Sequence, residues 1–207
     1  MRKTSSYSKS LVYAIKDGIY FSIMGGIGES YISPFAIFLK LSNSQIGLLA
    51  SIPQLLGAFV QLLSVSILNR IKDRMIIMIY GVVAQALAWI PILLLPLMFK
   101  PYASILLIIS VTAYFIFGNL ATPPWNSLMG DIVPESNRGA YFGYRNRIMS
   151  MYSLGAIALG GLLLHGTQKT GMPWVGFSLL FVSAVVARLL SAYSPGDETC
   201  ALRFHSP

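Results

Sequence analysis

The sequence predicts an all-α integral membrane protein that folds as a bundle of six transmembrane helices. Composition is the first reason, because 55% of the 207 residues are hydrophobic and only 11% are charged, whereas soluble domains carry about 25% charged residues. Mean hydropathy is +0.67, so the apolar side chains are too many for one compact soluble core. The apolar residues also fall into six runs, each bounded by charged, proline or turn residues.

Each run is long enough to cross a bilayer, since a helix needs roughly 20 residues to span a hydrocarbon core of about 30 Å. The predicted spans are Ile19–Leu39, Ile46–Leu68, Met75–Phe99, Tyr102–Trp125, Ile148–His165 and Trp174–Tyr193. Residues 1–17 then form a cytoplasmic amino-terminal segment, residues 18–193 the transmembrane domain, and residues 194–207 a cytoplasmic tail.

Prolines predict where these helices depart from a straight path. Pro91 and Pro96 lie in the third run, which we expect to bend near its outer end. Pro34 in the first run and Pro53 in the second are tolerable in transmembrane helices, because neighbouring helices satisfy the freed carbonyl groups.

Lysine and arginine residues in the short loops predict the orientation in the membrane. One side carries ten of them and the other three. The richer side holds Arg2, Lys3, Lys9, Lys16, Arg70, Lys72, Arg74, Arg138, Arg145 and Arg147, and the poorer side holds Lys40, Lys100 and Lys169. Both termini are therefore predicted to be cytoplasmic, in a multi-pass protein of the cell (inner) membrane. Arg188, near the inner end of the last span, is expected to reach that interface with its guanidinium group.

The sequence also argues against nucleic-acid binding, metal binding and catalysis. The formal charge of +8 comes from clusters between apolar runs, not from one basic face. His165 has no second ligand beside it, and Cys200 and His205 are too few for a metal site. Gly25-Gly26-Ile27-Gly28 lies inside an apolar helix, without the strand and lysine of a nucleotide loop. The sequence predicts no enzyme and no cofactor, with the lipid bilayer as its surroundings.

Glu29 is the leading candidate for a functional residue, because a charged carboxylate inside an apolar run costs a few kcal/mol or more. An acid held protonated by burial can change state with its surroundings, which suits proton coupling or cation binding. The alternative is a neutral acid bonded to a neighbouring helix, or a carboxylate near the outer interface. Asn119 and Gln85 are further candidates, with interhelical hydrogen bonding as the alternative.

Two stripes of small and polar residues suggest helix faces that avoid lipid. The second span carries Gly47, Ser51, Gln54, Ala58 and Gln61, and the first carries Ser22, Gly26, Glu29 and Ser33. Residues at these spacings share one helical face, which we expect to meet protein or a water-filled cavity. Close packing is the favoured explanation for the small residues. Gln54 and Gln61 are too large for packing alone, so a part in solute binding stays equally open for them.

The long cytoplasmic connection predicted from Asn126 to Arg147 carries a recognisable motif. The sequence there runs Pro123-Pro124-Trp125-Asn126-Ser127-Leu128-Met129-Gly130-Asp131-Ile132-Val133-Pro134-Glu135, then Arg138-Gly139, then Tyr141-Phe142-Gly143-Tyr144-Arg145-Asn146. An aspartate, Pro-Glu, Arg-Gly and a further glycine between the fourth and fifth helices resemble the major facilitator superfamily of secondary transporters. The charges of Asp131, Glu135, Arg138 and Arg145 are expected to form a network that holds the helix ends, with a solvated polar loop as the alternative.

The loop between the second and third spans takes the place of the superfamily's other signature, which has a glycine, Asp-Arg, a glycine and a basic pair. Here Asn69 stands where the aspartate is expected, and the glycines are missing. Arg70 and Arg74 keep the charge cluster, and Asp73 is the displaced candidate to replace the aspartate of a gate.

The resemblance implies a secondary transporter that moves a small solute by alternating access, with proton coupling through Glu29 as an option. Such transporters consist of two six-helix halves, each made of two inverted three-helix repeats. In the family the first and fourth helices of each half line the cavity, which agrees with Glu29 and Asn119.

This chain resembles one half only, from about Lys16 to Tyr193, and its polar ending leads us to expect a truncated product. A second half or a homodimer partner is then expected to complete the transport unit. No three-helix repeat is evident in the sequence. The alternative of a different class is a non-transporting membrane protein, either an inert fragment or an assembly partner.

Overall fold

The computed structural model describes residues 2–71, 73–98 and 102–203, and the side chains of 11–68, 73–95 and 102–191. The described residues form helices and short turns, with no strand among them. The helices are α1 (Arg2–Ile27), α2 (Ile32–Phe38), α3 (Asn43–Ile71), α4 (Arg74–Leu87), α5 (Trp89–Met98), α6 (Ala103–Ile132), α7 (Arg138–Lys169) and α8 (Pro173–Arg203). Two 3₁₀ turns, η1 (Glu29–Tyr31) and η3 (Glu135–Asn137), precede α2 and α7.

Five helical segments of the described chain are long and apolar enough to cross a membrane. They are Asn43–Leu68, Arg74–Leu95, Ala103–Ile132, Glu135–Lys169 and Pro173–Ser191. These segments correspond to the second to sixth predicted spans, so the all-α membrane fold is confirmed. The first predicted span, Ile19–Leu39, is not a single helix, because it is divided among α1, η1 and α2.

Pro34 explains the division of that first span. Proline has no N–H for the intrahelical hydrogen bond, so a helix holds it most easily in its first turn. α2 begins at Ile32, which makes Pro34 its third residue. Pro91 is likewise the third residue of α5, which begins at Trp89. The third span was predicted to bend near its outer end, but its helix is interrupted at Ala88, near the middle of the span, and the first span contains a similar interruption.

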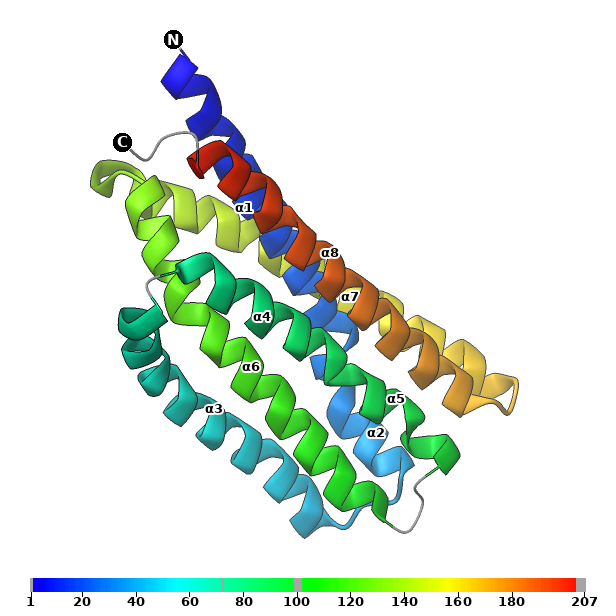
Figure 1. The fold of residues 1–207 in the computed structure, drawn as a ribbon. Helices are drawn as coiled ribbons and strands as arrows, with labels where there is room; N and C mark the ends of the chain where they lie inside the picture. The colour runs from blue at the N-terminus through cyan, green and yellow to red at the C-terminus, as the bar shows by residue number, and fades with distance from the viewer. Residues whose placement is uncertain (1, 72, 99–101, 204–207) are drawn as a thin grey trace.

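The helices pack with an internal symmetry that is not visible in the sequence. α6 packs along α3 and α4, and α1 packs along α7 and α8, as Figure 1 shows. Exchanging α1 with α6, α3 with α7 and α4 with α8 converts one set of neighbours into the other. This is the arrangement expected of two inverted three-helix repeats.

Glycines allow close contacts between these helices. A Cβ added to Gly26 of α1 would lie 2.7 Å from the Ser153 carbonyl oxygen of α7. A Cβ added to Gly57 of α3 would lie 2.6 Å from Asn119 Nδ2 of α6. At Gly26 a larger residue would hold the helices apart, because the neighbouring atom belongs to the backbone, whereas at Gly57 the Asn119 side chain would have to move. Close packing, the favoured explanation for the small residues of the stripes, applies to Gly26, but it is wrong for Gly47 of α3, where an added Cβ would meet no atom within 4 Å.

An aromatic cluster occupies the core at the end of the bundle that contains α2 and α5. The rings of Trp89 and Tyr114 lie 5.0 Å apart, those of Trp89 and Phe181 5.3 Å, and those of Phe35 and Phe181 4.9 Å. All four side chains are fully buried. The cluster joins α2, α5, α6 and α8, and it fixes the position of the Tyr114 hydroxyl.

The connection between α6 and α7 is shorter than predicted. The sequence indicated a loop from Asn126 to Arg147, but α6 continues to Ile132 and α7 begins at Arg138. Pro134 is the only proline between those predicted loop ends, so the polar segments on both sides of it stay helical. Hydropathy marks where the apolar residues end, and these two helices continue beyond that point.

Candidate functional site

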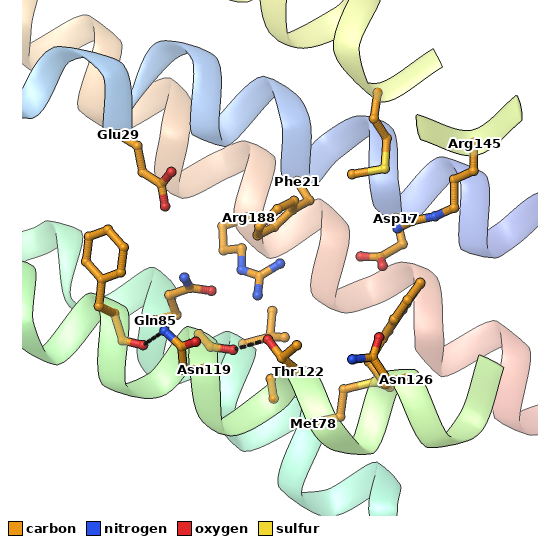
Figure 2. A pocket seen from close by; sticks show the side chains of 16 residues that line it. Asp17, Phe21, Glu29, Met78, Gln85, Asn119, Thr122, Asn126, Arg145 and Arg188 are labelled. Carbon is orange, nitrogen blue, oxygen red and sulfur yellow. Dashed lines mark hydrogen bonds between the residues drawn. The ribbon is translucent and has the colours of Figure 1, made fainter. Parts of the chain in front are cut away.

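A cavity of about 370 Å³ lies between α1, α7 and α8 on one side and α4 and α6 on the other. Figure 2 shows side chains from both sides pointing into it. Its polar lining residues are Asp17, Glu29, Gln85, Asn119, Thr122, Asn126, Arg145 and Arg188. Its larger apolar lining residues are Phe21, Met78, Val82, Phe115, Trp125 and Met149. Charged groups thus meet inside an otherwise apolar bundle.

Glu29 lies in the cavity wall at the break between α1 and α2. The Tyr114 hydroxyl, which is fully buried in α6, donates a hydrogen bond of 2.6 Å to Glu29 Oε1. The same hydroxyl lies 3.0 Å from Met24 Sδ. The 3₁₀ turn η1 begins at Glu29, so the interruption of the helix sets the position of this carboxylate. An acid and a phenol from the two repeats therefore meet at one hydrogen bond.

Arg188 is buried in the cavity wall, with 5% of the residue exposed. Its Nη1 donates to Ser191 Oγ at 3.0 Å, and the Ser191 hydroxyl donates to Asp17 Oδ1 at 2.5 Å. The guanidinium carbon lies 5.0 Å from the centre of the Phe21 ring. The prediction that Arg188 reaches the membrane interface is therefore wrong. Because α8 packs along α1, the face that carries Arg188 points inward.

Arg145 also lies in the cavity wall, with 8% of the residue exposed. Its guanidinium carbon is 4.4 Å from the centre of the Trp125 ring, and its Nε donates to the Ala14 carbonyl oxygen at 3.2 Å. The sequence grouped Arg145 with the charges of the cytoplasmic loop, and the structure instead places it between α7, α6 and α1. The contact with Trp125 joins the two sides of the cavity.

The predicted charges between the spans form two ion pairs among the described residues. Arg74, at the start of α4, pairs with Asp131 near the end of α6. Asp73 does not take part in that pair and instead accepts hydrogen bonds from the Met75 and Ile76 amides, at 3.0 and 3.2 Å, as the cap of α4. The link between the two signature segments is therefore Arg74 with Asp131.

The second ion pair closes the turn between α6 and α7. Arg138 Nη1 lies 3.6 Å from Glu135 Oε1. Arg138 also donates to the carbonyl oxygens of Val133 and Gly130, at 3.0 and 2.7 Å, near the end of α6. Gly139 is the second residue of α7, and a Cβ added there would meet no atom within 4 Å. Asn69 and Arg70 lie in the last turn of α3, and their side chains are outside the described residues.

The polar stripe of α3 points away from the cavity. Gln54 is exposed and Gln61 is half-buried, and neither lines the cavity. The buried face of α3 carries Gly57 and Ser64, and the Ser64 hydroxyl donates to the Leu120 carbonyl oxygen of α6 at 2.8 Å. The structure therefore brings Glu29 and Asn119 together around one cavity and leaves Gln54 and Gln61 outside it.

Sequence reasoning missed Asp17, Tyr114 and Arg188 at this site. Asp17 stood at the boundary assigned to the cytoplasmic segment, and Tyr114 is one of 11 tyrosines without a distinguishing motif. Arg188 was visible as a charge in an apolar run but was assigned to the interface. Among the described residues, no three His, Cys, Asp or Glu side chains gather in a way that could hold a metal ion.

Comparison with protein-family models identifies the family of this chain. The model of the Major Facilitator Superfamily matches residues 10–203. The chain belongs to the major facilitator superfamily. It is therefore an integral membrane protein of a transporter family, as the loop motif indicated. Comparison with curated proteins gives no match, and comparison with solved structures gives none either.

Proposed function

We propose that this chain is a secondary active transporter, or one half of such a transporter, that moves a small solute by alternating access. The observation that carries the proposal is the cavity of about 370 Å³, where charged and amide side chains of both repeats converge. In transporters built from inverted repeats the solute site lies between the repeats near the bilayer midplane. A cavity that opens to one membrane side at a time is the simplest use of this arrangement.

The proposal includes six spans within residues 18–193, with α1, η1 and α2 together as the first. Both termini are then cytoplasmic, in the cell (inner) membrane, with residues 1–17 and 194–207 on that side. The exposed Gln54 on α3 is poorly suited to lipid, which supports a protein partner on that face. We assign a second six-helix half or a second copy of the chain to that position.

The contact between Arg145 and Trp125 is the gate that we propose for one end of the cavity. It joins α7 to α6 across the cavity, with 4.4 Å between the guanidinium carbon and the ring centre. The Arg74 and Asp131 pair joins α4 to α6, which lie on the same side of the cavity. The ion pair then keeps one wall rigid, while the cation–π contact breaks and reforms as the walls rock.

Glu29 is the proposed proton-coupling residue. Its hydrogen bond with Tyr114 from α6 supports this assignment, because relative movement of α1 and α6 changes the partners of the carboxylate. Substitution Glu29→Gln keeps a hydrogen-bonding side chain, but the amide cannot bind and release a proton near neutral pH. It should abolish accumulation driven by a pH gradient and leave solute exchange at equal pH intact.

The test is uptake into proteoliposomes from a panel of sugars, amino acids, organic anions and organic cations, with and without an inward proton gradient. Glu198→Gln is the matched control, because it makes the same exchange in the predicted tail. Accumulation that Glu29→Gln leaves unchanged would remove the coupling role. A protein that transports none of the panel would favour the alternative, a non-transporting membrane protein that serves as an assembly partner.

A further inference from the structure

Arg188 is a buried cation with unused hydrogen-bonding capacity. Its Nη1 donates to Ser191, whereas its Nε is buried without a hydrogen-bond partner among the described residues. An unpaired charged donor in a bundle interior is unfavourable, and it becomes favourable once an acceptor arrives. A guanidinium group binds carboxylate and phosphate groups through two parallel N–H bonds. The guanidinium of Arg188, which keeps an unpaired N–H, therefore suits an oxyanion.

The carboxylates of the cavity do not fill this position. Asp17 accepts the hydroxyl of Ser191, and Glu29 accepts the hydroxyl of Tyr114. The ion pairs found in the described part of the chain join Arg74 with Asp131 and Arg138 with Glu135, and neither includes Arg188. Both cavity carboxylates thus have protein donors, while the arginine retains a donor for something else.

The opposite wall offers a second unsatisfied polar atom. Gln85 of α4 is 3% exposed, and its Oε1 has no hydrogen-bond partner among the described residues. Figure 2 shows the Arg188 guanidinium pointing from α8 towards the side of the cavity that carries Gln85 and Thr122. The Phe21 ring, 5.0 Å from the guanidinium carbon, packs against the arginine. Two residues that each keep an unsatisfied polar atom, Arg188 and Gln85, thus line the cavity from opposite walls.

We infer that the transported solute is a small organic anion, and that Arg188 binds its carboxylate or phosphate group. Gln85 binds a hydrogen-bonding group elsewhere on the same solute. This inference rests on the proposed transport function and names its substrate class. A cation is the rival solute, because Asp17 and Glu29 each accept one of the hydrogen bonds described and, when ionised, keep their negative charge.

The charges of the cavity connect this inference with proton coupling. With all four groups ionised, the charges of Asp17 and Glu29 cancel those of Arg145 and Arg188. A proton on Glu29 then leaves one net positive charge, which a monoanion neutralises. Tyr114 and Arg188 are the groups that face Glu29 from α6 and α8. Proton binding at Glu29 and anion binding at Arg188 should therefore favour one another.

The experiment is ligand binding by the purified full chain in mild detergent, followed by thermal stabilisation and by tryptophan fluorescence, since Trp125 lines the cavity. The probes are propionate, propionamide and propylammonium, which match in size, together with glycerol phosphate and glycerol. At least one anion should bind about tenfold more tightly than its uncharged and cationic counterparts. The two anions distinguish a carboxylate site from a phosphate site.

Variants of Arg188 test the residue itself. Arg188→Gln should weaken anion binding by about 10- to 100-fold, the range expected for hydrogen bonds to a charged group. Arg188→Lys keeps the positive charge but not the two parallel N–H donors, so its affinity for anions should lie between those of the wild type and Arg188→Gln. Arg147→Gln removes an exposed arginine of α7 and should bind anions like the wild type.

Three results would overturn the inference: tighter binding of propylammonium than of the anions, equal anion binding by the wild type and Arg188→Gln, or no binding of either anion. If Arg188→Gln does not fold, the inference is still tested by the preference of the wild type for anions and by anion binding to Arg188→Lys. Anion binding without uptake into proteoliposomes would refute transport and keep the anion site. Uptake of a neutral or cationic solute without anion binding would support transport and refute the anion site.

Discussion

At the scale of single residues, the tyrosine that meets Glu29 is the contact with the clearest energetic consequence. Tyr114 is fully buried, and its hydroxyl is the protein donor to the carboxylate. A buried polar group that loses its partner costs about 1–3 kcal/mol. The pair thus contributes to stability whether or not Glu29 moves a proton.

Substitution Tyr114→Phe should lower the free energy of unfolding by about 1–3 kcal/mol, because it removes the donor to Glu29 and keeps the ring. Denaturant unfolding in mild detergent measures this difference. Tyr80→Phe is the matched control, since Tyr80 is 72% exposed on α4 and should tolerate the exchange. Equal effects of the two substitutions would mean that the hydrogen bond is not stabilising.

At the scale of helices, the contact between α1 and α7 depends on the absence of one side chain. A Cβ at Gly26 would lie 2.7 Å both from the Ser153 carbonyl oxygen and from Ala156 Cβ. A backbone carbonyl cannot turn aside as a flexible side chain does. The two helices must therefore separate to admit even a methyl group.

Gly26→Ala should destabilise the bundle by about 1–3 kcal/mol, the usual cost of overpacking. The measurement is thermal unfolding of the purified chain in detergent. Gly155→Ala provides the control in α7, because a Cβ there would meet no atom within 4 Å. Alanine is also the better helix former, so Gly155→Ala should be neutral or stabilising. A stable Gly26→Ala protein would contradict the close packing of α1 on α7.

Helix boundaries show how prolines and glycines act differently from hydropathy. Pro91 allowed a bend in the third span to be predicted, although not its place near the middle of the span, whereas Pro34 was expected to be tolerated within the first helix. The break in the first span also involves Gly28, where an added Cβ would lie 2.7 Å from the Trp89 ring. Gly28 follows the end of α1, and its approach to a residue of another helix is a contact that local sequence does not reveal.

At the scale of the whole molecule, the proposed orientation has a direct test. In a Cys200→Ser background the chain contains no cysteine, so single cysteines report one position each. Thr170→Cys lies in the turn between α7 and α8, and Ser136→Cys lies in the turn between α6 and α7. In intact cells a membrane-impermeant maleimide should label Thr170→Cys and spare Ser136→Cys.

Permeabilised cells supply the control for that experiment, since both cysteines should then react. Labelling of Ser136→Cys in intact cells, with Thr170→Cys protected, would reverse the proposed orientation. Labelling of both in intact cells would mean that α7 does not cross the membrane.

The symmetry of the bundle is also a property of the whole molecule. The neighbours of α1 and of α6 correspond under exchange of the two repeats, although no three-helix repeat is evident in the sequence. Packing requires only that small and large side chains alternate suitably between helices, and many sequences satisfy that. The two repeats therefore share a packing arrangement that their residue identities do not show.

The sequence by itself determined the membrane class, the positions of the apolar runs and the family. Hydropathy and charge act locally, because each segment partitions into lipid or water according to its own residues. The family followed from the charged motif between the fourth and fifth spans. These properties do not depend on which helix faces which.

Only the tertiary structure decided which polar side chains meet. Tyr114 and Glu29 are 85 positions apart, and Ser191 and Asp17 are 174 positions apart. The rotation of each helix about its axis decides such meetings, and packing across the bundle sets that rotation. For this reason Gln54 was a candidate that lies outside the cavity, whereas Arg188, which was assigned to the membrane surface, lies inside it.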